Sequence, residues 1–240
     1  MSHAKNAVSY SRLVDICTGY GGTYNPGRPT LQLKAMRALL KEAQSSLQHV
    51  SQMRHAYNSI VNERSIAFEK LDVQAQRIIG TLLSLQVPKP TIQDARYYSR
   101  LIAGRRATPR LPVLSEDSEE QPLKVRGYTQ LSYVAKASNF FKLVQMVEAL
   151  PVYTTNEPDL MIPVLKERAA YLQQKNEEVH KAQVALKNAM KQRDRLMYKG
   201  NGAMINNARA IKHYVRVVFG ARSTEADQMT DVSFTQPPVK

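Results

Sequence analysis

The stretch Tyr-Asn-Pro-Gly-Arg-Pro-Thr-Leu at residues 24–31 returns 129 positions later as Tyr-Thr-Thr-Asn-Glu-Pro-Asp-Leu at residues 153–160. The Tyr, the second Pro and the Leu keep their places, and Thr30 becomes Asp159, another residue suited to cap a helix. Upstream, Arg-Leu-Val at residues 12–14 resembles Lys-Leu-Val at residues 142–144, shifted by one further residue. Such self-similarity indicates a duplicated helical unit.

A long apolar seam follows the first copy of this stretch. Stepping alternately by three and four residues from Leu33 to Leu85 gives sixteen positions, of which fourteen are apolar and two are Arg54 and Arg64. This heptad-like spacing is typical of helices that cross at a shallow angle, as in coiled coils. The sequence predicts a start at Thr30, directly after Pro29.

The second copy has its own seam at the same offset, from Ile162 to Met197. Eight of its eleven positions are apolar, and Asn176, Gln183 and Arg193 are polar. The predicted helix ends near Lys199, because the following Gly-Asn-Gly favours a turn, and a return helix is expected over residues 204–219. Residues 31–86 contain no such break, so they form either one helix or a pair joined near Asp72. The repeat favours the turn.

The remaining segments divide the chain. We expect a first helical unit at 1–104, a mobile acidic and proline-bearing linker at 105–127, a second helical unit at 128–222 and a tail at 223–240. The tail carries Val232 and Phe234, which are expected to dock as a short strand-like segment. The predicted fold is all-α, an elongated antiparallel bundle of two homologous units with long helices.

Several residues also resemble an uncharacterised family of duplicated, long-helix bacterial proteins. The likeness lies in the Tyr-Asn-Pro at 24–26, in residues 151–160, in the mid-helix pattern around Arg193, and in Val-Phe-Gly-x-x-Ser at 218–223. The family has no established activity. The resemblance therefore implies the architecture and no catalytic residue.

Composition limits the class of protein. The formal net charge is +14, and residues 1–110 hold 16 Lys and Arg against 6 Asp and Glu, which favours acidic partners. A single cysteine, Cys17, provides no disulfide framework and is expected to be a buried core thiol. The sequence lacks a signal peptide or an apolar run long enough to span a membrane, so a cytoplasmic location is expected.

No motif in the sequence predicts an enzyme or a cofactor site. Residues 19–22 are glycine-rich but lack the lysine of a phosphate loop, and no Cys or His spacing suits zinc. The closest approach to a di-iron motif is Glu177 with His180, but the first unit has Ser51 where a matching histidine would stand. We therefore expect no enzymatic activity, no metal and no cofactor.

Four polar residues on the two seams form the first candidate site, with functional and structural interpretations. They could bind an anion, fix the helix register, or extend their heads to water. For the arginines we expect buried stems and guanidinium groups paired by other helices or carbonyls, since the neighbours Glu63 and Asp194 are expected to face elsewhere. These residues are Arg54, Arg64, Gln183 and Arg193.

Basic residues beside tyrosines form a second candidate site, which suits stacking on nucleic acid but is also typical of an ordinary helix surface. The function we expect is a non-enzymatic interaction or structural protein, with protein partners or self-association. The alternative is a basic nucleic-acid-associated protein. The residues for that alternative are Arg96, Tyr97, Tyr98, Arg100, Arg105, Arg106, Lys212 and Arg216.

Overall fold

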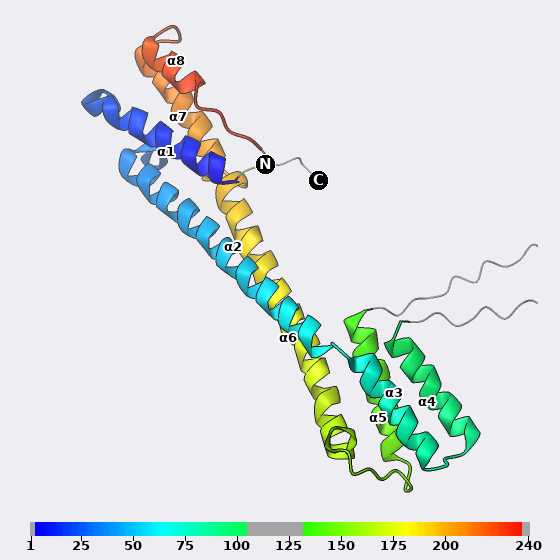
Figure 1. Ribbon diagram of the computed structural model, residues 1–240. Coiled ribbons are helices and arrows are strands. Elements are labelled where there is room, and N and C mark those ends of the chain that lie inside the picture. The colour runs from blue at the N-terminus through cyan, green and yellow to red at the C-terminus, as the bar shows by residue number, and fades with distance from the viewer. Residues whose placement is uncertain (1–2, 105–131, 237–240) are drawn as a thin grey trace, which may run out of the picture. The chain divides into compact units, whose positions relative to one another are not determined.

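The computed structural model describes residues 3–104 and 132–236 (Figure 1). About 80% of this part of the chain is helical, and it contains no strand. The prediction of an all-α protein is therefore confirmed. Within the same residues, no helix combines the length and apolarity that crossing a membrane requires.

The chain forms two compact units that do not follow the predicted units at 1–104 and 128–222. Unit 1 contains residues 1–58 and 181–240, and unit 2 contains residues 59–180. The boundaries differ because two long helices, α2 (Leu33–Ala67) and α6 (Ile162–Tyr198), each begin in one unit and end in the other. The predicted linker at 105–127 lies outside the described residues.

Unit 1 is built from the ends of the described chain. Helix α7 contacts α1, α8 and the short 3-10 helix η2 that precedes α2. Its core is mixed aliphatic and aromatic, with Tyr10, Leu13 and Met36 fully buried. The elements that lie wholly within it are α1 (His3–Gly19), η1 (Gly21–Thr23), η2 (Pro29–Leu31), α7 (Met204–Phe219) and α8 (Thr224–Thr230).

Unit 2 is continuous in sequence. Helix α4 packs against α3 and α5, and the 3-10 helix η3 contacts α3 (Figure 1). Phe140, Ile78 and Leu165 are fully buried in its core. The elements are α3 (Leu71–Ser84), α4 (Lys89–Ile102), α5 (Tyr133–Glu148) and η3 (Pro158–Leu160).

The two copies of the repeated stretch have the same local structure. Each forms a 3-10 turn that begins with proline and leads into a long helix, η2 before α2 and η3 before α6. In each, a buried tyrosine donates its hydroxyl hydrogen to the carbonyl of the leucine seven residues later. The O···O distance is 2.8 Å for Tyr24 and Leu31, and 3.0 Å for Tyr153 and Leu160.

Each 3-10 turn also accepts a hydrogen bond from a side-chain amide on the helix that follows one of the long helices, which is α7 for η2 and α3 for η3. Asn207 on α7 donates to the carbonyl of Thr30 at 2.8 Å, and Gln74 on α3 donates to the carbonyl of Asp159 at 3.2 Å. Each amide is the fourth residue of its helix. Asn207 additionally accepts a hydrogen bond from the buried Tyr10 hydroxyl at 2.8 Å.

Equivalent positions of the two copies are also buried, at nearly constant sequence offsets. Met36 and Leu165 are both fully buried on the long helices, 129 positions apart. Leu13 and Leu143, 130 positions apart, are fully buried on α1 and α5. The return helices α3 and α7 bury the following residues at an offset of 133: Leu71 and Met204, Ala75 and Ala208, Ile78 and Ile211, and Leu82 and Val215.

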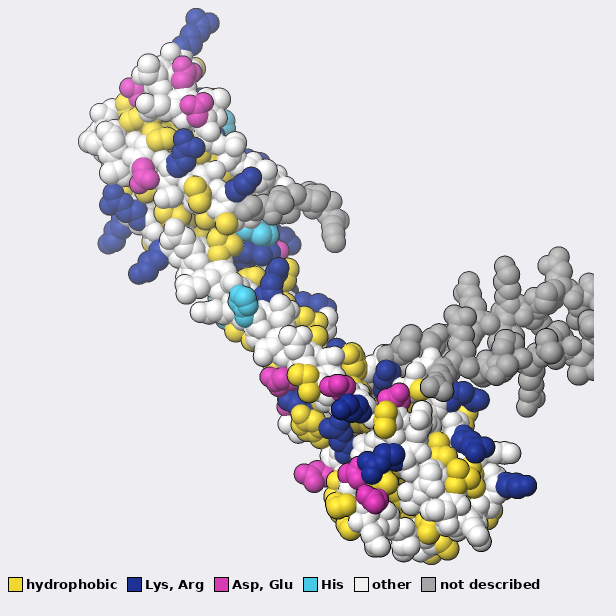
Figure 2. Space-filling model, in the orientation of Figure 1, with side chains coloured by type: hydrophobic (Ala, Val, Ile, Leu, Met, Phe, Trp, Pro, Cys, Tyr) yellow, Lys and Arg dark blue, Asp and Glu magenta, His cyan; other side chains and the backbone are white. Residues whose placement is uncertain are grey.

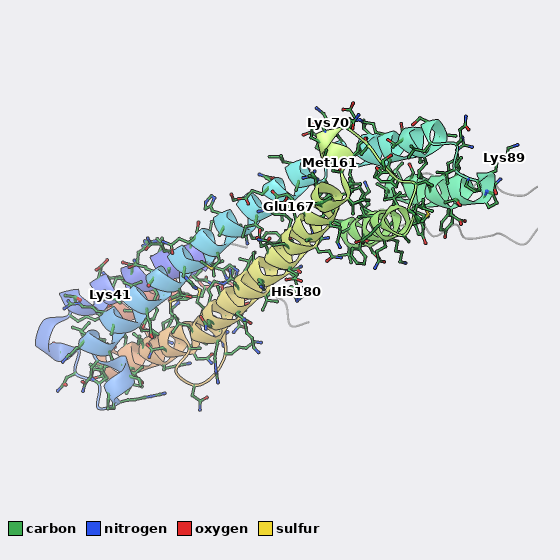
Figure 3. All side chains as sticks on the ribbon, turned by 90° about the horizontal axis from the view of Figure 1, so that it is seen from below. Lys41, Lys70, Lys89, Met161, Glu167 and His180 are labelled. Atoms are coloured by element: carbon green, nitrogen blue, oxygen red, sulfur yellow. The ribbon has the colours of Figure 1, made fainter. Side chains whose placement is uncertain are left out.

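A break separates α2 from α3. The repeat predicts this break, whereas the apolar seam alone predicts one continuous helix. Lys70 lies just before α3 with φ of 58°, in the left-handed region that ends a helix (Figure 3). The corresponding break after α6 uses Gly200, with φ of 96°. Because Lys70 carries a side chain, its conformation is strained where that of Gly200 is not.

The middle of α2 departs from the predicted seam. No residue from 51 to 66 is buried, although the seam positions Tyr57 and Val61 fall in this stretch and are partly buried. The heptad spacing continues through it, so periodicity alone overestimates how much of the helix is covered.

The residues after α8 dock on unit 1 as predicted, but not as a strand. Val232 is 1% exposed, and Phe234 packs against the core. Asn6 on α1 binds both backbone groups of Thr235. The Nδ2 of Asn6 donates to the carbonyl of Thr235 at 2.8 Å, and the amide of Thr235 donates to the Oδ1 of Asn6 at 3.0 Å.

Candidate binding groove

Arg193 is buried and paired, but by a partner that the sequence pattern argues against. It is 5% exposed, and its Nε and Nη2 donate to Oδ1 of Asp194 at 2.9 and 2.7 Å. The expectation that Asp194 faces elsewhere was wrong, because two guanidinium nitrogens of Arg193 reach the carboxylate of this neighbour. The pair shields a charge that could not be removed by deprotonation.

Arg64 has a different environment. Its guanidinium carbon lies 4.3 Å from the centroid of the Tyr133 ring on α5, so a cation–π contact replaces an ion pair. Its Nε is buried without a hydrogen-bond partner among the described residues, as is Oδ1 of Asn176, whose Nδ2 donates to the carbonyl of Tyr133. The two seam arginines therefore do not form one repeated site.

The other two seam residues do not contribute to a buried polar layer. Arg54 and Gln183 are both exposed. For Arg54 the physical reason is that the middle of α2 buries no residue, so a polar seam position there faces water at little cost. The interpretation of Arg54 and Gln183 as anion-binding positions stays a prediction.

The basic and aromatic residues on α4 lie in unit 2 and partly cluster. Tyr97 is 49% exposed, the guanidinium carbon of Arg100 lies 5.5 Å from its ring centroid, and its ring meets that of Tyr98 edge-on. Both tyrosines line a hollow of about 690 Å³ with Lys142 of α5. Arg96 is exposed, and Arg105 and Arg106 lie outside the described residues.

The basic residues on α7 lie in unit 1, and one of them is already engaged. Lys212 donates from Nζ to the carbonyl of Val232, and its Nζ lies 5.8 Å from the centroid of the Phe234 ring. Burial, followed by repulsion from Arg216, lowers the pKa of Lys212. Lys212 therefore fixes the segment after α8, which makes it a poor phosphate contact, whereas Arg216 is exposed.

Basic side chains do not form a single patch on the face that Figure 2 shows. Lys and Arg are distributed over both units and are interrupted by apolar, acidic and other polar side chains. On that face the basic side chains are thus dispersed and do not form one continuous stripe.

Cys17 behaves as the core thiol that the sequence predicts. It is fully buried, and burial raises the pKa of its thiol to about 12. A thiol that stays protonated is a poor nucleophile. In the described residues, no group of three His, Cys, Asp or Glu side chains is arranged to hold a metal ion.

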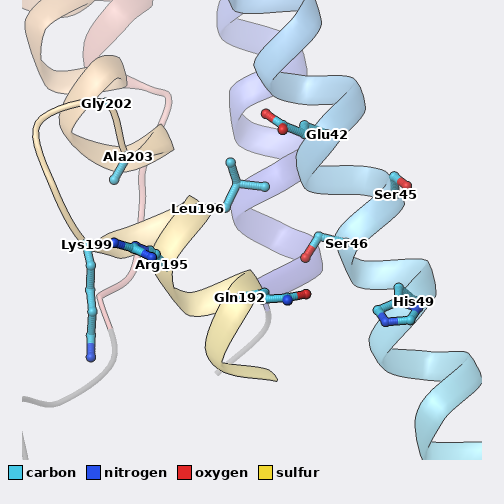
Figure 4. A pocket seen from close by; sticks show the side chains of 10 residues that line it. All are labelled: Glu42, Ser45, Ser46, His49, Gln192, Arg195, Leu196, Lys199, Gly202 and Ala203. Atoms are coloured by element: carbon cyan, nitrogen blue, oxygen red, sulfur yellow. The ribbon is translucent and has the colours of Figure 1, made fainter. Parts of the chain in front are cut away.

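A groove with charged and polar side chains on its rim lies in unit 1, where residues of α2 and of the end of α6 line it together. It has a volume of about 550 Å³. Two matching stripes at helical spacing line it, together with Gly202 and Ala203 from the turn before α7 (Figure 4). The stripe on α2 contains Glu42, Ser45, Ser46 and His49, and the other contains Gln192, Arg195 and Leu196 of α6 with Lys199 directly after the helix.

The two cations of the groove have no ion-pair partner among the described residues. The described ion pairs involve neither Arg195 nor Lys199. Figure 4 shows both on the side of the groove that carries the turn with Gly202, whereas Glu42, Ser46 and His49 come from α2. The cationic residues and Glu42 therefore come from different segments that line the groove.

An ion-pair cluster occupies the corresponding place in unit 2. Ser46 corresponds to Lys175 at the 129-residue offset, His49 to Glu178, and Gln192 to Glu63. Lys175 Nζ lies 2.8 Å from Glu178 and 2.9 Å from Glu63, and its side chain is only 13% exposed. The two carboxylates, Glu178 first, raise the pKa of Lys175. Unit 2 thus fills with a paired lysine the position that unit 1 lines with a serine.

The groove was missed at the level of sequence, although two signals for it were present. Its residues recur at spacings of three and four on each long helix, beside the seam rather than on it. The repeat also aligns Ser46 with Lys175, a change from a small to a long side chain. The apolar seam directed attention to polar residues on the seam itself.

Comparisons with protein-family models, with curated proteins and with solved structures found no match to this chain. The resemblance to duplicated long-helix bacterial proteins accordingly stays a prediction.

Proposed function

We propose that this protein is a non-enzymatic interaction protein that arose by duplication of a helical unit and binds a partner helix along α2. The duplication is supported by the shared turn, by its matched tyrosine and amide hydrogen bonds, and by burial at constant offsets. A protein of this kind acts through its surface and requires no cofactor.

The observation that carries the interaction is the exposed part of α2 in unit 1. From residue 51 to residue 58 no side chain is buried, yet Met53 and Tyr57 lie on the apolar side and are only partly covered. A partner helix could bury this surface, and each fully buried apolar side chain contributes about 1.5–3 kcal/mol. Amphipathic helices that dock in this way use anchors at spacings of three and four residues.

Charge selects the kind of partner. Helix α2 carries five Lys and Arg residues against two Glu. Two copies of α2 would repel one another, whereas an acidic amphipathic helix would be attracted. The proposed partner is therefore an acidic helix.

A fluorescently labelled, designed acidic amphipathic peptide tests the proposal with the full chain. We expect the chain to bind the peptide, with affinity falling as salt is raised, and Tyr57→Glu to weaken binding by about tenfold or more. The matched control is Val217→Glu, which places the same charge at an apolar residue on α7 that is already 83% exposed.

Light scattering on the same samples separates the outcomes. A monomer that binds the peptide in a Tyr57-dependent manner supports the proposal. A stable dimer that excludes the peptide would assign the surface to a second copy and overturn it. Equal weakening by both substitutions would show that only added charge matters, and would also overturn it.

The second candidate function is nucleic-acid association, and the Tyr97–Arg100 stack on α4 favours it. An exposed aromatic ring beside a guanidinium can stack on a base. A gel shift with single-stranded RNA and DNA at several salt concentrations tests it, with Tyr97→Ala as the variant. A shift that Tyr97→Ala leaves unchanged would reduce the interaction to nonspecific charge attraction.

A further inference from the structure

The groove of unit 1 has the size and lining of a small-molecule site. Its volume of about 550 Å³ falls within the range of about 300–1,000 Å³ that is typical of ligand pockets. Seven of the ten lining residues come from the two helices α2 and α6. We propose that this groove binds a small phosphate monoester whose remainder carries hydroxyl groups. The proposal is independent of the partner helix on α2.

The two cations define the phosphate end. Arg195 lies in the last turn of α6, and Lys199 directly follows the helix, with its backbone amide donating to the carbonyl of Arg195 at 3.2 Å. Neither has an ion-pair partner among the described residues, and both line the side of the groove near Gly202 (Figure 4). A guanidinium presents planar, paired donors that match phosphate oxygens, and an ammonium adds a point charge.

The opposite side of the groove suits hydroxyl groups rather than a second phosphate. Glu42 on α2 places a carboxylate in the lining, which repels an anion but accepts hydrogen bonds from hydroxyls. Ser46 on α2 and Gln192 on α6 add groups that both donate and accept. The distribution of charge therefore orients the ligand, with its phosphate toward α6 and its hydroxyl groups toward α2.

Comparison with unit 2 supports a ligand at this place. There, the same helix stripes meet through Lys175, which is held between Glu63 and Glu178. In unit 1 these three positions are Ser46, His49 and Gln192, so the ion-pair cluster is absent. The place that the cluster fills in unit 2 is thus open in unit 1, next to Arg195 and Lys199, which have no ion-pair partner among the described residues.

Isothermal titration calorimetry of the full chain at about 0.15 M salt tests the proposal, with ribose 5-phosphate as the probe. Inorganic phosphate and ribose serve as the two halves of the probe. We expect ribose 5-phosphate to bind more tightly than either half. We expect Arg195→Ala/Lys199→Ala to weaken binding by about tenfold or more, because two charge-assisted contacts are lost.

Two further variants make the result decisive. Lys187→Ala/Lys191→Ala removes the same charge from α6 outside the groove, and it should change affinity by less than about twofold if the contacts are direct. Ser46→Lys/His49→Glu/Gln192→Glu places the ion-pair cluster of unit 2 in unit 1 and should abolish binding while circular dichroism shows an intact fold.

The contrary outcomes are equally specific. Equal weakening by both double-alanine variants would show general charge attraction and overturn the proposal. Retained binding in the triple variant, or tighter binding of a short oligonucleotide than of ribose 5-phosphate, would also overturn it. Failure of all probes to bind would remove the phosphate assignment while leaving the partner helix on α2 untouched.

Discussion

Unit 1 and unit 2 share a buried framework and differ in the polar surface laid over it. Each holds a proline-initiated turn with a tyrosine hydroxyl and a side-chain amide. Further along the long helices, unit 2 has the Lys175 ion-pair cluster, whereas unit 1 has a groove of about 550 Å³. Close packing restricts the buried positions, but a surface stripe tolerates substitution with small changes in stability. Differences in function between the units are therefore expected in the stripes.

The strongest way to break the comparison is to truncate matched core residues. Met36→Ala in unit 1 and Leu165→Ala in unit 2 remove fully buried side chains at equivalent positions. Each should lower the free energy of unfolding by about 2–5 kcal/mol. Urea denaturation followed by far-UV circular dichroism measures both. A loss below about 1 kcal/mol for either would mean that the two sites are not equivalent in packing.

A pH series sharpens the comparison at Cys17, whose counterpart in unit 2 is Val147 at an offset of 130. Burial raises the pKa of the thiol from 9.0 to about 12. The stabilising contribution is therefore complete below the pKa of the unfolded thiol and is lost as pH rises from there toward about 12. We expect the free energy of unfolding to fall between pH 8 and pH 10.

Cys17→Val is the matched control for this series. It places the residue of unit 2 in unit 1 and removes the titrating group. The fall between pH 8 and pH 10 should become shallower in the variant, as measured by urea denaturation at each pH. An unchanged slope would show that the thiol is not responsible.

The amides that hold the two turns should differ in their contribution. Asn207 is 3% exposed and also accepts from Tyr10, so Asn207→Ala leaves a buried hydroxyl without its partner and should cost about 1–3 kcal/mol. Gln74 makes one longer bond, and Gln74→Ala should cost about 0.5–1.5 kcal/mol. Urea denaturation midpoints of the two variants, compared at equal m-values, test which substitution lowers stability more. A larger loss for Gln74→Ala would contradict it.

The smallest expected effect lies at the junction of α2 and α3. Lys70 has φ of 58° where the other junction has Gly200. Lys70→Gly should raise the free energy of unfolding by about 0.5–1 kcal/mol, because the left-handed strain is relieved and only part of the gain is offset by the freedom of the unfolded chain. Lys199→Gly, directly before Gly200, is a control that should not stabilise. A destabilising Lys70→Gly would show that its side chain matters more than its backbone.

Much of the fold could be predicted because apolar spacing and turn residues are local signals. The range of α7 is the predicted one, and the docking of Val232 is also confirmed. The break at Lys70 is invisible to periodicity, because a single left-handed residue leaves the spacing of apolar side chains unchanged, and only the repeat indicated it. The division into compact units could not be predicted, because it depends on which distant helices pack together.

The candidate site residues and the groove could be predicted less well than the fold. Seam spacing identified Arg193 as buried, but its pairing with Asp194 depends on a side-chain conformation that spacing does not specify. The role of Lys212 depends on the docked segment at Val232, which is twenty residues away in sequence. Arg195 and Lys199 looked like ordinary surface charges, because their lack of ion-pair partners is a property of the folded arrangement.

The way the compact units divide the chain has a consequence for how the protein is made. Unit 2 is one uninterrupted stretch, residues 59–180, and can complete its contacts while synthesis continues. Unit 1 joins residues 1–58 to residues 181–240, so helix α1 must wait for α7 before its buried face is covered. On the ribosome, unit 2 is thus expected to fold first and to bring together the segments that build unit 1, which lowers the loop-closure entropy of that later step.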